Sequence, residues 1–187
     1  MMKKRIVFIG LWLLWLGVLC GTAHAQSSEL RRFHVNLSGG FGLPKIPFSH
    51  FRTPISVLGG TGLNFRLFDN WLVQANGYAL YTFNMGTAHG EGGELKFNVA
   101  WATFDILRRL RGVYRHSNFI LAGVGQYHLM QQFESQEDNL NTTGICLGLV
   151  DWRHWTRFSM VTEIRWHLLF DPSPQPQILS ITLGILL

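Results

Sequence analysis

The chain has 187 residues, of which 47% are hydrophobic and 14% charged, with 20 glycines, 6 prolines and 2 cysteines. This length suits one domain. So high a hydrophobic content excludes a disordered polymer, and two cysteines exclude a disulfide scaffold or a multi-cysteine zinc module. A composition rich in glycine and aromatics but poor in charge is typical of membrane β-structure.

Residues 1–25 have the pattern of a cleaved export signal. A basic start, Lys3 to Arg5, precedes the apolar stretch from Ile6 to Leu19, and Ala23-His24-Ala25 supplies small residues for a signal peptidase. We expect cleavage after Ala25. The apolar stretch is shorter than the roughly 20 residues of a transmembrane anchor. Lipidation at Cys20 is a minor alternative, because bulky Leu19 stands where a lipobox has Gly or Ala.

Removal of this signal lowers the net charge from +5 to +2, because three of the 16 basic residues and none of the 11 acidic ones leave. The remaining chain therefore lacks the electrostatic footprint of a nucleic-acid-binding protein. Only Cys146 remains, so no intrachain disulfide can form.

Alternation of apolar and polar residues recurs along the rest of the chain. From Trp71 to Phe83 one set of alternate residues is wholly apolar and the other is mixed. The segment is long enough for a tilted membrane strand, which needs about nine to eleven residues. Eight such segments lie near residues 33–43, 55–67, 71–83, 94–106, 118–130, 144–152, 157–170 and 178–187.

An even number of strands lets a closed antiparallel barrel hold both termini on one side without an edge in lipid. The predicted fold is therefore all-β: an eight-stranded antiparallel up-and-down transmembrane β-barrel over residues 26–187. Short connections at 68–70 and 153–156 alternate with longer ones at 44–54, 84–93, 131–143 and 171–177, as periplasmic turns alternate with external loops. The basic segment Leu107 to Ser117 is long for a turn and is assigned to the periplasmic side by parity alone.

Aromatic residues are predicted to form two lipid-facing girdles, one at each membrane interface. The periplasmic girdle would contain Trp71, Trp101, Phe119, Trp152 and Phe158, and the outer one Tyr81, Phe83, Phe97, Tyr127 and Trp166.

Three segments of the last third resemble the closing strands of small OmpA/OmpX-type outer-membrane barrels. They are Gly144 to Trp152, the stretch Phe158 to Phe170 containing Glu163-Ile164-Arg165-Trp166, and Leu179 to Ile185. The resemblance implies a barrel in the bacterial outer membrane, inserted by the barrel assembly machinery after delivery by periplasmic chaperones. Leu187 stands where this pattern usually has a terminal aromatic, so the assembly signal is weakened.

The lumen is predicted to hold a balanced set of charges that form ion pairs. An eight-stranded barrel has just enough interior for side chains, which argues against a general pore. The inward positions collect Arg66, Lys96 and Arg165 against Glu94, Asp151 and Glu163, joined by His128 and by Asn64, Gln74, Asn76 and Gln126. In the fifth and sixth strands the residues predicted to point inward are apolar. This indicates either a partly apolar interior or a register different from the predicted one in these two strands.

A lipid-modifying enzyme, such as a lipid A deacylase or acyltransferase, is the alternative from another class. Arg115-His116-Ser117-Asn118 looks like a deacylase motif, but adjacent strand residues point to opposite faces. His167 above Glu163 could act as a base, although no serine in that strand completes a triad. A narrow channel is a third hypothesis.

Neither a metal-ligand spacing nor a cofactor motif is present, so we expect no metal and no cofactor. The expected role is structural, in envelope integrity or surface interaction, with outer-membrane lipids and lipopolysaccharide as partners.

Overall fold

The computed structural model describes residues 33–45, 56–82, 95–113, 116–133, 136–155, 158–170 and 175–187. Side chains of residues 95, 96, 111–113, 131–133, 136 and 137 are not described. The predicted export signal and Glu94 lie outside these ranges.

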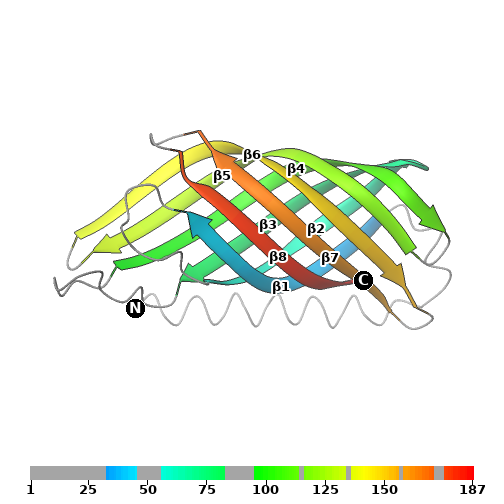
Figure 1. The fold of residues 1–187 in the computed structure, drawn as a ribbon, viewed down its shortest axis with the longest axis horizontal. Helices are drawn as coiled ribbons and strands as arrows, with labels where there is room; N and C mark the ends of the chain where they lie inside the picture. Colours follow the sequence, from blue (N-terminus) through cyan, green and yellow to red (C-terminus); the bar gives the residue numbers. More distant parts are fainter. Residues whose placement is uncertain are drawn as a thin grey trace.

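Eight antiparallel strands close into one barrel in sequence order, as the alternation predicts (Figure 1). The strands are β1 Phe33–Lys45, β2 Ser56–Phe68, β3 Trp71–Thr82, β4 Leu95–Val113, β5 His116–Phe133, β6 Gln136–His154, β7 Ser159–Leu169 and β8 Gln177–Leu186. The barrel closes where β1 pairs with β8, from Asn36 opposite Leu186 to Lys45 opposite Gln177. Val35 and Leu187 extend this ladder with two backbone hydrogen bonds, of 3.2 and 2.8 Å.

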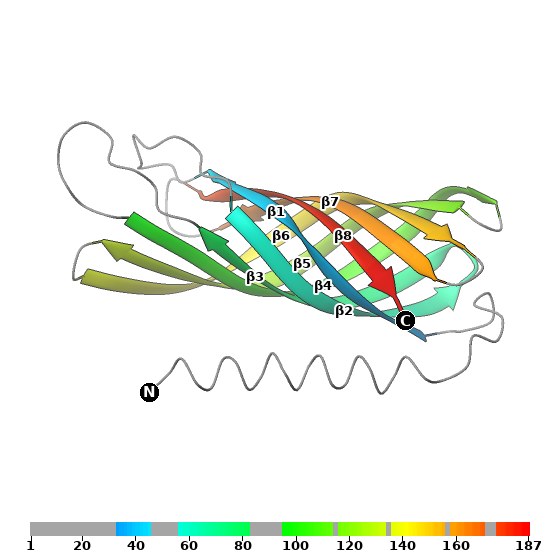
Figure 2. The same ribbon diagram turned by 90° about the horizontal axis from the view of Figure 1, so that it is seen from below.

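We call the end at which β2–β3, β4–β5 and β6–β7 connect the turn end; Phe33 and Leu187 lie there too (Figure 2). The opposite end is the loop end. The basic segment 107–117 lies at the turn end, since Arg109 N donates a 2.8 Å hydrogen bond to Asn70 O. Its assignment as a connection is wrong, because Arg111, Gly112 and Val113 pair with β5 and only residues 114 and 115 separate the strands.

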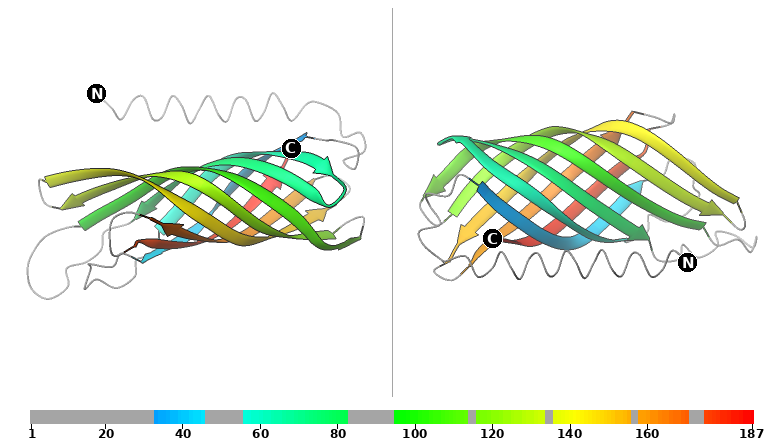
Figure 3. Two further views of the ribbon diagram at one scale, coloured as in Figure 1. Left: turned by 90° about the horizontal axis from the view of Figure 1, so that it is seen from above. Right: turned by 180° about the vertical axis from the view of Figure 1, so that it is seen from behind.

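The segment 131–143, predicted as a loop, is also mostly strand. β5 continues to Phe133 and β6 begins at Gln136, and the two pair over this whole length. β6 pairs with β7 only from Gly144 onward, so the β5–β6 hairpin projects beyond the barrel at the loop end (Figure 3).

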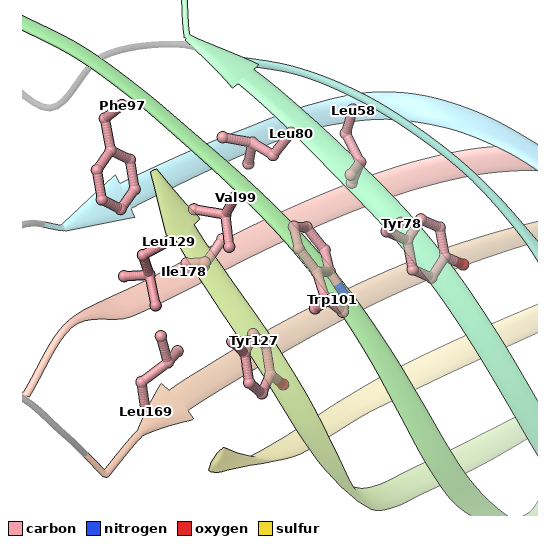
Figure 4. Close-up of a cluster of buried hydrophobic side chains, with 10 residues drawn as sticks. All are labelled: Leu58, Tyr78, Leu80, Phe97, Val99, Trp101, Tyr127, Leu129, Leu169 and Ile178. Carbon is pink, nitrogen blue, oxygen red and sulfur yellow. The ribbon is translucent and has the colours of Figure 1, made fainter. Parts of the chain in front are cut away.

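The interior is packed in three layers along the barrel axis. A loop-end apolar layer contains Leu58, Tyr78, Leu80, Phe97, Val99, Trp101, Tyr127, Leu129, Leu169 and Ile178 (Figure 4). A turn-end apolar layer contains Leu72, Leu107, Phe119, Leu121, Cys146, Val150, Trp152, Val161 and Leu186. Between them the same strands place buried polar residues, including Gln74, Asn76, Asp105, Glu163 and Arg165.

The outer surface is a continuous belt of large apolar side chains contributed by every strand. Members include Leu37, Phe41, Leu63, Trp71, Tyr81, Phe104, Ile106, Ile120, Val124, Leu147, Leu149, Ile164, Trp166, Ile181 and Leu183, each at least 40% exposed. Water-soluble monomers do not carry an apolar surface of this extent, so the belt faces lipid. No helix in the described ranges is long and apolar enough to cross a membrane, a criterion that does not apply to strands.

Candidate functional site

Arg165 of β7 is the centre of the polar layer. Its Nε donates to Glu163 Oε2 at 2.8 Å, its Nη1 to Asp105 Oδ2 at 2.6 Å and its Nη2 to Gln74 Oε1 at 3.0 Å. The side chains of Arg165, Glu163 and Asp105 are at most 1% exposed. The guanidinium therefore bridges β3, β4 and β7 across the lumen.

Each carboxylate receives further donors. Glu163 accepts hydrogen bonds from Gln74 Nε2 at 3.0 Å and from the Tyr78 hydroxyl at 2.9 Å. Asp105 Oδ2 accepts from Asn76 Nδ2 at 2.7 Å and from Thr103 Oγ1 at 3.0 Å. Buried charges are tolerated when they are paired and hydrogen-bonded in this way.

Strand alternation explains why these residues meet. Glu163, Arg165 and His167 are alternate residues of β7 and all point inward, as do Gln74 and Asn76 of β3. Gly123 of β5 lies opposite Asp105, and a Cβ at this position would overlap Asp105 Oδ1. The missing side chain leaves the room that the carboxylate occupies.

The structure places the other predicted lumen residues differently. Arg66 is half-buried near the turn end of β2, and Lys96 is described only through its backbone, opposite Gln132. Asp151 faces outward and contacts His116 and Arg153, which corrects its assignment to the lumen. His128 is also on the outer face, where its Nδ1 lies 2.7 Å from Asn141 Oδ1.

The predicted girdles are divided between the two faces of the sheet. Trp71, Tyr81, Phe158 and Trp166 lie on the outside, 40–53% exposed. The assignment of Trp101, Tyr127 and Trp152 to lipid is wrong, because they are at most 4% exposed and fill the two apolar layers. Phe97 and Phe119 are buried with them, and Phe83 lies outside the described residues.

These corrections have one physical cause. On β4, β5 and β6 the lumen face carries most of the large aromatic residues, whereas the lipid face, apart from Phe104, carries aliphatic and some polar ones. The expectation of polar residues inside and apolar residues outside therefore assigned both faces wrongly. The sequence analysis did not use Asp105. A charged residue on the same strand face as Trp101 and Thr103 was the signal that this face of β4 points into the lumen.

Histidine and serine do come together, but not in the arrangement of a hydrolase. His167 Nδ1 lies 2.9 Å from the Tyr127 hydroxyl and its Nε2 lies 3.3 Å from Ser180 Oγ. All three side chains are at most 1% exposed, so a lipid substrate has no access to them. At the turn end, His154 contacts Ser159 at 2.8 Å, while the contact to Asp151 is made by a different histidine, His116.

Among the described residues, no group of three or more His, Cys, Asp or Glu is arranged to hold a metal ion. Cys146 is buried in the turn-end apolar layer, where its sulfur lies 3.8 Å from Arg165 Nη1.

No protein-family model and no curated protein sequence matches the chain. Solved structures do match it. Neisserial surface protein A superimposes with a TM-score of 0.65 over 83% of this chain and 97% of that one, at 6% identity. A major outer membrane protein from Thermus thermophilus superimposes with a TM-score of 0.56 over 84% of this chain and 100% of that one, at 11% identity. Ail, the attachment invasion locus protein of Yersinia pestis, superimposes with a TM-score of 0.52 over 83% of this chain and 97% of that one, at 12% identity.

The fold is that of the small bacterial outer-membrane β-barrels. It accounts for the apolar belt and for the sequential strand order. It also accounts for the filled interior, since eight strands enclose just enough space for side chains. The superpositions establish the fold. At identities this low they do not establish the function, which has to be argued from the residues of this chain.

Proposed function

We propose that the protein is an integral barrel of the bacterial outer membrane, with a closed lumen and a structural or surface-interaction role. The packed interior carries this proposal. Two apolar layers enclose the Arg165 network on both sides, so the lumen offers no continuous aqueous path. The fully buried His167 and Ser180 argue in the same direction against lipid-modifying catalysis.

Folding the protein into liposomes and recording from planar bilayers tests this proposal. We expect heat-modifiable gel mobility and a β-type circular dichroism spectrum, with no discrete conductance steps. Discrete steps from folded protein would contradict a closed lumen. Lipid A mass spectrometry on cells with and without the protein is a further test, and a changed acyl pattern would favour an enzyme.

A specific feature supports surface interaction. The β5–β6 hairpin projects past the barrel at the loop end, and its outer face carries Gln126, Asn139 and Asn141, all exposed. Within the described ranges, residues 136–142 of β6 form a strand ladder with β5 only, whereas Thr143 O accepts a 2.9 Å hydrogen bond from Phe170 N. A projecting strand with a free backbone edge is a surface on which an extended segment of a partner could pair.

The hairpin can be shortened without opening the barrel. Deletion of residues 131–133 and 136–138 keeps residues 134 and 135 as a connection between the cross-strand partners Met130 and Asn139. It removes segments of β5 and β6 that have no ladder to β7, at the expense of the β5 pairing of β4 residues 95–97. We expect the shortened protein to fold with unchanged heat-modifiable gel mobility. Cells that express it should adhere less to cultured host cells than cells that express the full-length protein. Unchanged adhesion would restrict the role to envelope integrity, which detergent sensitivity of a deletion strain measures.

Barrel assembly machinery, periplasmic chaperones and lipopolysaccharide are proposed partners. Export through the predicted signal 1–25 would deliver the chain to them, and outer-membrane fractionation with sequencing of the mature amino terminus tests this route.

A further inference from the structure

A charged cluster interrupts the lipid-facing surface at the turn end of β5 and β6. Asp151 Oδ2 accepts a 2.8 Å hydrogen bond from Arg153 Nε, and Asp151 Oδ1 contacts His116 Nε2. The three side chains come from neighbouring strands, since His116 is opposite Arg153 and Asn118 is opposite Asp151. One carboxylate thereby holds two basic side chains next to each other.

These basic groups border an open hollow of about 380 Å³, lined by His116, Arg153, His154 and Trp155. Trp155 is 46% exposed and packs on Phe158 with ring centroids 5.0 Å apart. Exposed tryptophan and phenylalanine at a strand end are typical of the membrane–water interface. The hollow therefore lies at the depth of lipid headgroups.

The hollow has hydrogen-bond donors to offer. The Arg153 side chain is 59% exposed and contacts Asp151 through its Nε, so a second acceptor can reach its terminal nitrogens from the solvent side. His116 is 47% exposed, and its Nε2 contacts the Asp151 carboxylate, so its ring forms one wall of the hollow. An arginine with accessible terminal nitrogens is a bidentate donor for phosphate.

An apolar strip leads from the hollow towards the middle of the barrel. Beyond Asn118, the outward residues of β5 are apolar and include Ile120 and Val124, and those of β6 beyond Asp151 include Leu149 and Leu147. Acyl chains lying on this strip would place their phosphate beside His116 and Arg153. The surface thus matches a lipid molecule along its length: the apolar strip would contact the acyl chains, and the basic hollow at the turn end would contact the phosphate.

The surrounding charge favours an anionic lipid. Besides Arg153, the described part of the turn end contains Arg66, Arg109 and Arg108, the last lying over the Trp71 ring at 5.6 Å. The acidic residues described at this end are Asp69 and Asp151. An excess of arginine raises the local concentration of anions.

We propose that this hollow is a binding site for the phosphate of an anionic glycerophospholipid, with Arg153 as its donor, His116 as a lining side chain and Asp151 as the positioning residue of both. The proposal rests on the proposed membrane location, because the acyl chains must lie on the lipid-facing strip. It adds a specific lipid site to a surface that otherwise contacts lipid without selectivity.

Native mass spectrometry of the folded protein in a neutral detergent measures the site directly. Phosphatidylglycerol and phosphatidylcholine with the same acyl chains are titrated against the wild type and Arg153→Gln. We expect the wild type to prefer phosphatidylglycerol. Arg153→Gln should weaken its binding roughly threefold or more, as the loss of a partly exposed charge-assisted hydrogen bond implies.

Two matched controls remove the same charge elsewhere. Arg108→Gln acts at the turn end but outside the hollow, and Lys45→Gln acts on an exposed residue at the loop end. Lys45→Gln should bind phosphatidylglycerol like the wild type, and Arg108→Gln, which removes only part of the surrounding charge, should weaken binding clearly less than Arg153→Gln. An equal loss for Arg108→Gln would show diffuse attraction to a basic rim, and an absent preference in the wild type would also overturn the site.

Failure of this inference is distinguishable from failure of the proposed function. A protein that inserts into liposomes but shows no phosphatidylglycerol preference contradicts the lipid site alone. A protein that does not insert contradicts the membrane location itself. Heat-modifiable mobility of each variant confirms that it has folded before its lipid binding is compared.

Discussion

Arg165 balances the negative charge of two buried carboxylates at once, so the free energy of unfolding should depend strongly on this residue. Glu163 and Asp105 are both fully buried, and each is bonded to the same guanidinium. Removing one partner of a buried ion pair costs about 3–5 kcal/mol, since the other charge stays in a poorly polarisable interior. Here a single substitution would leave two such charges.

We therefore expect Arg165→Met to lower the free energy of unfolding by about 3–5 kcal/mol or to abolish folding. Urea titration of the refolded barrel in liposomes, followed by gel mobility, measures this. Adding Glu163→Gln and Asp105→Asn should recover most of the loss, because no unpaired charge remains. Arg153→Met, on an exposed arginine, serves as the control and should change stability by at most about 1 kcal/mol. A triple variant no better than Arg165→Met would contradict the charge-compensation argument.

The sequence could predict part of this network and not the rest. Glu163 and Arg165 were recognisable because two opposite charges stand two residues apart in a strand whose intervening residues, such as Ile164 and Trp166, are mostly apolar. Asp105 was not, since its strand carries aromatics on the lumen face and the pairing with Arg165 spans 60 positions. Contacts of that kind depend on how eight strands are staggered, which alternation within one strand does not determine.

The strands themselves differ in how well their patterns predict the inward face. β3 carries its polar residues on one face, and β7 carries all its charged residues and its histidine on one face, so the inward faces of both strands are unambiguous. β4, β5 and β6 carry apolar residues on both faces, and side-chain size distinguishes the two. Large aromatics on these strands fill the lumen opposite small residues such as Gly123 and Gly125.

Brominated phospholipids should separate the two classes of tryptophan. Single-tryptophan variants that retain Trp71 or Trp166 should be quenched strongly, because these rings are 40% and 41% exposed on the lipid face. Variants that retain Trp101 or Trp152 should be quenched weakly, since these rings are 4% exposed inside the barrel. Strong quenching of Trp101 would place it on the lipid face after all.

Hydrogen exchange should distinguish the two halves of β6. Residues 144–154 are paired on both sides, with β5 and with β7, whereas the ladder to β7 does not reach residues 136–142. We expect the amides of 136–142 that point away from β5 to exchange much faster than those of 144–154 in detergent micelles. Equal protection along the strand would show that another segment covers this edge.

Closure of the whole molecule depends on the meeting of β1 and β8, the two strands farthest apart in sequence. Their ladder forms only when all six intervening strands are in place, so it completes the removal of unpaired backbone groups from lipid. The eight-stranded count was predictable from the sequence, whereas the close approach of these backbones was not.

Gly40 shows how tight this junction is. A Cβ at Gly40 would overlap the carbonyl oxygen of Ile181 on β8 and come within 2.8 Å of the Thr182 Cα, whereas one at Gly39 would meet only Leu58 O at 3.6 Å. We expect Gly40→Ala to lower the folded fraction, with a cost of about 1–3 kcal/mol for forced separation of the strands, and Gly39→Ala to fold like the wild type. The heat-modifiable fraction after refolding into liposomes measures both. Equal folding of the two variants would mean that β1 and β8 can move apart at Gly40 without loss of closure.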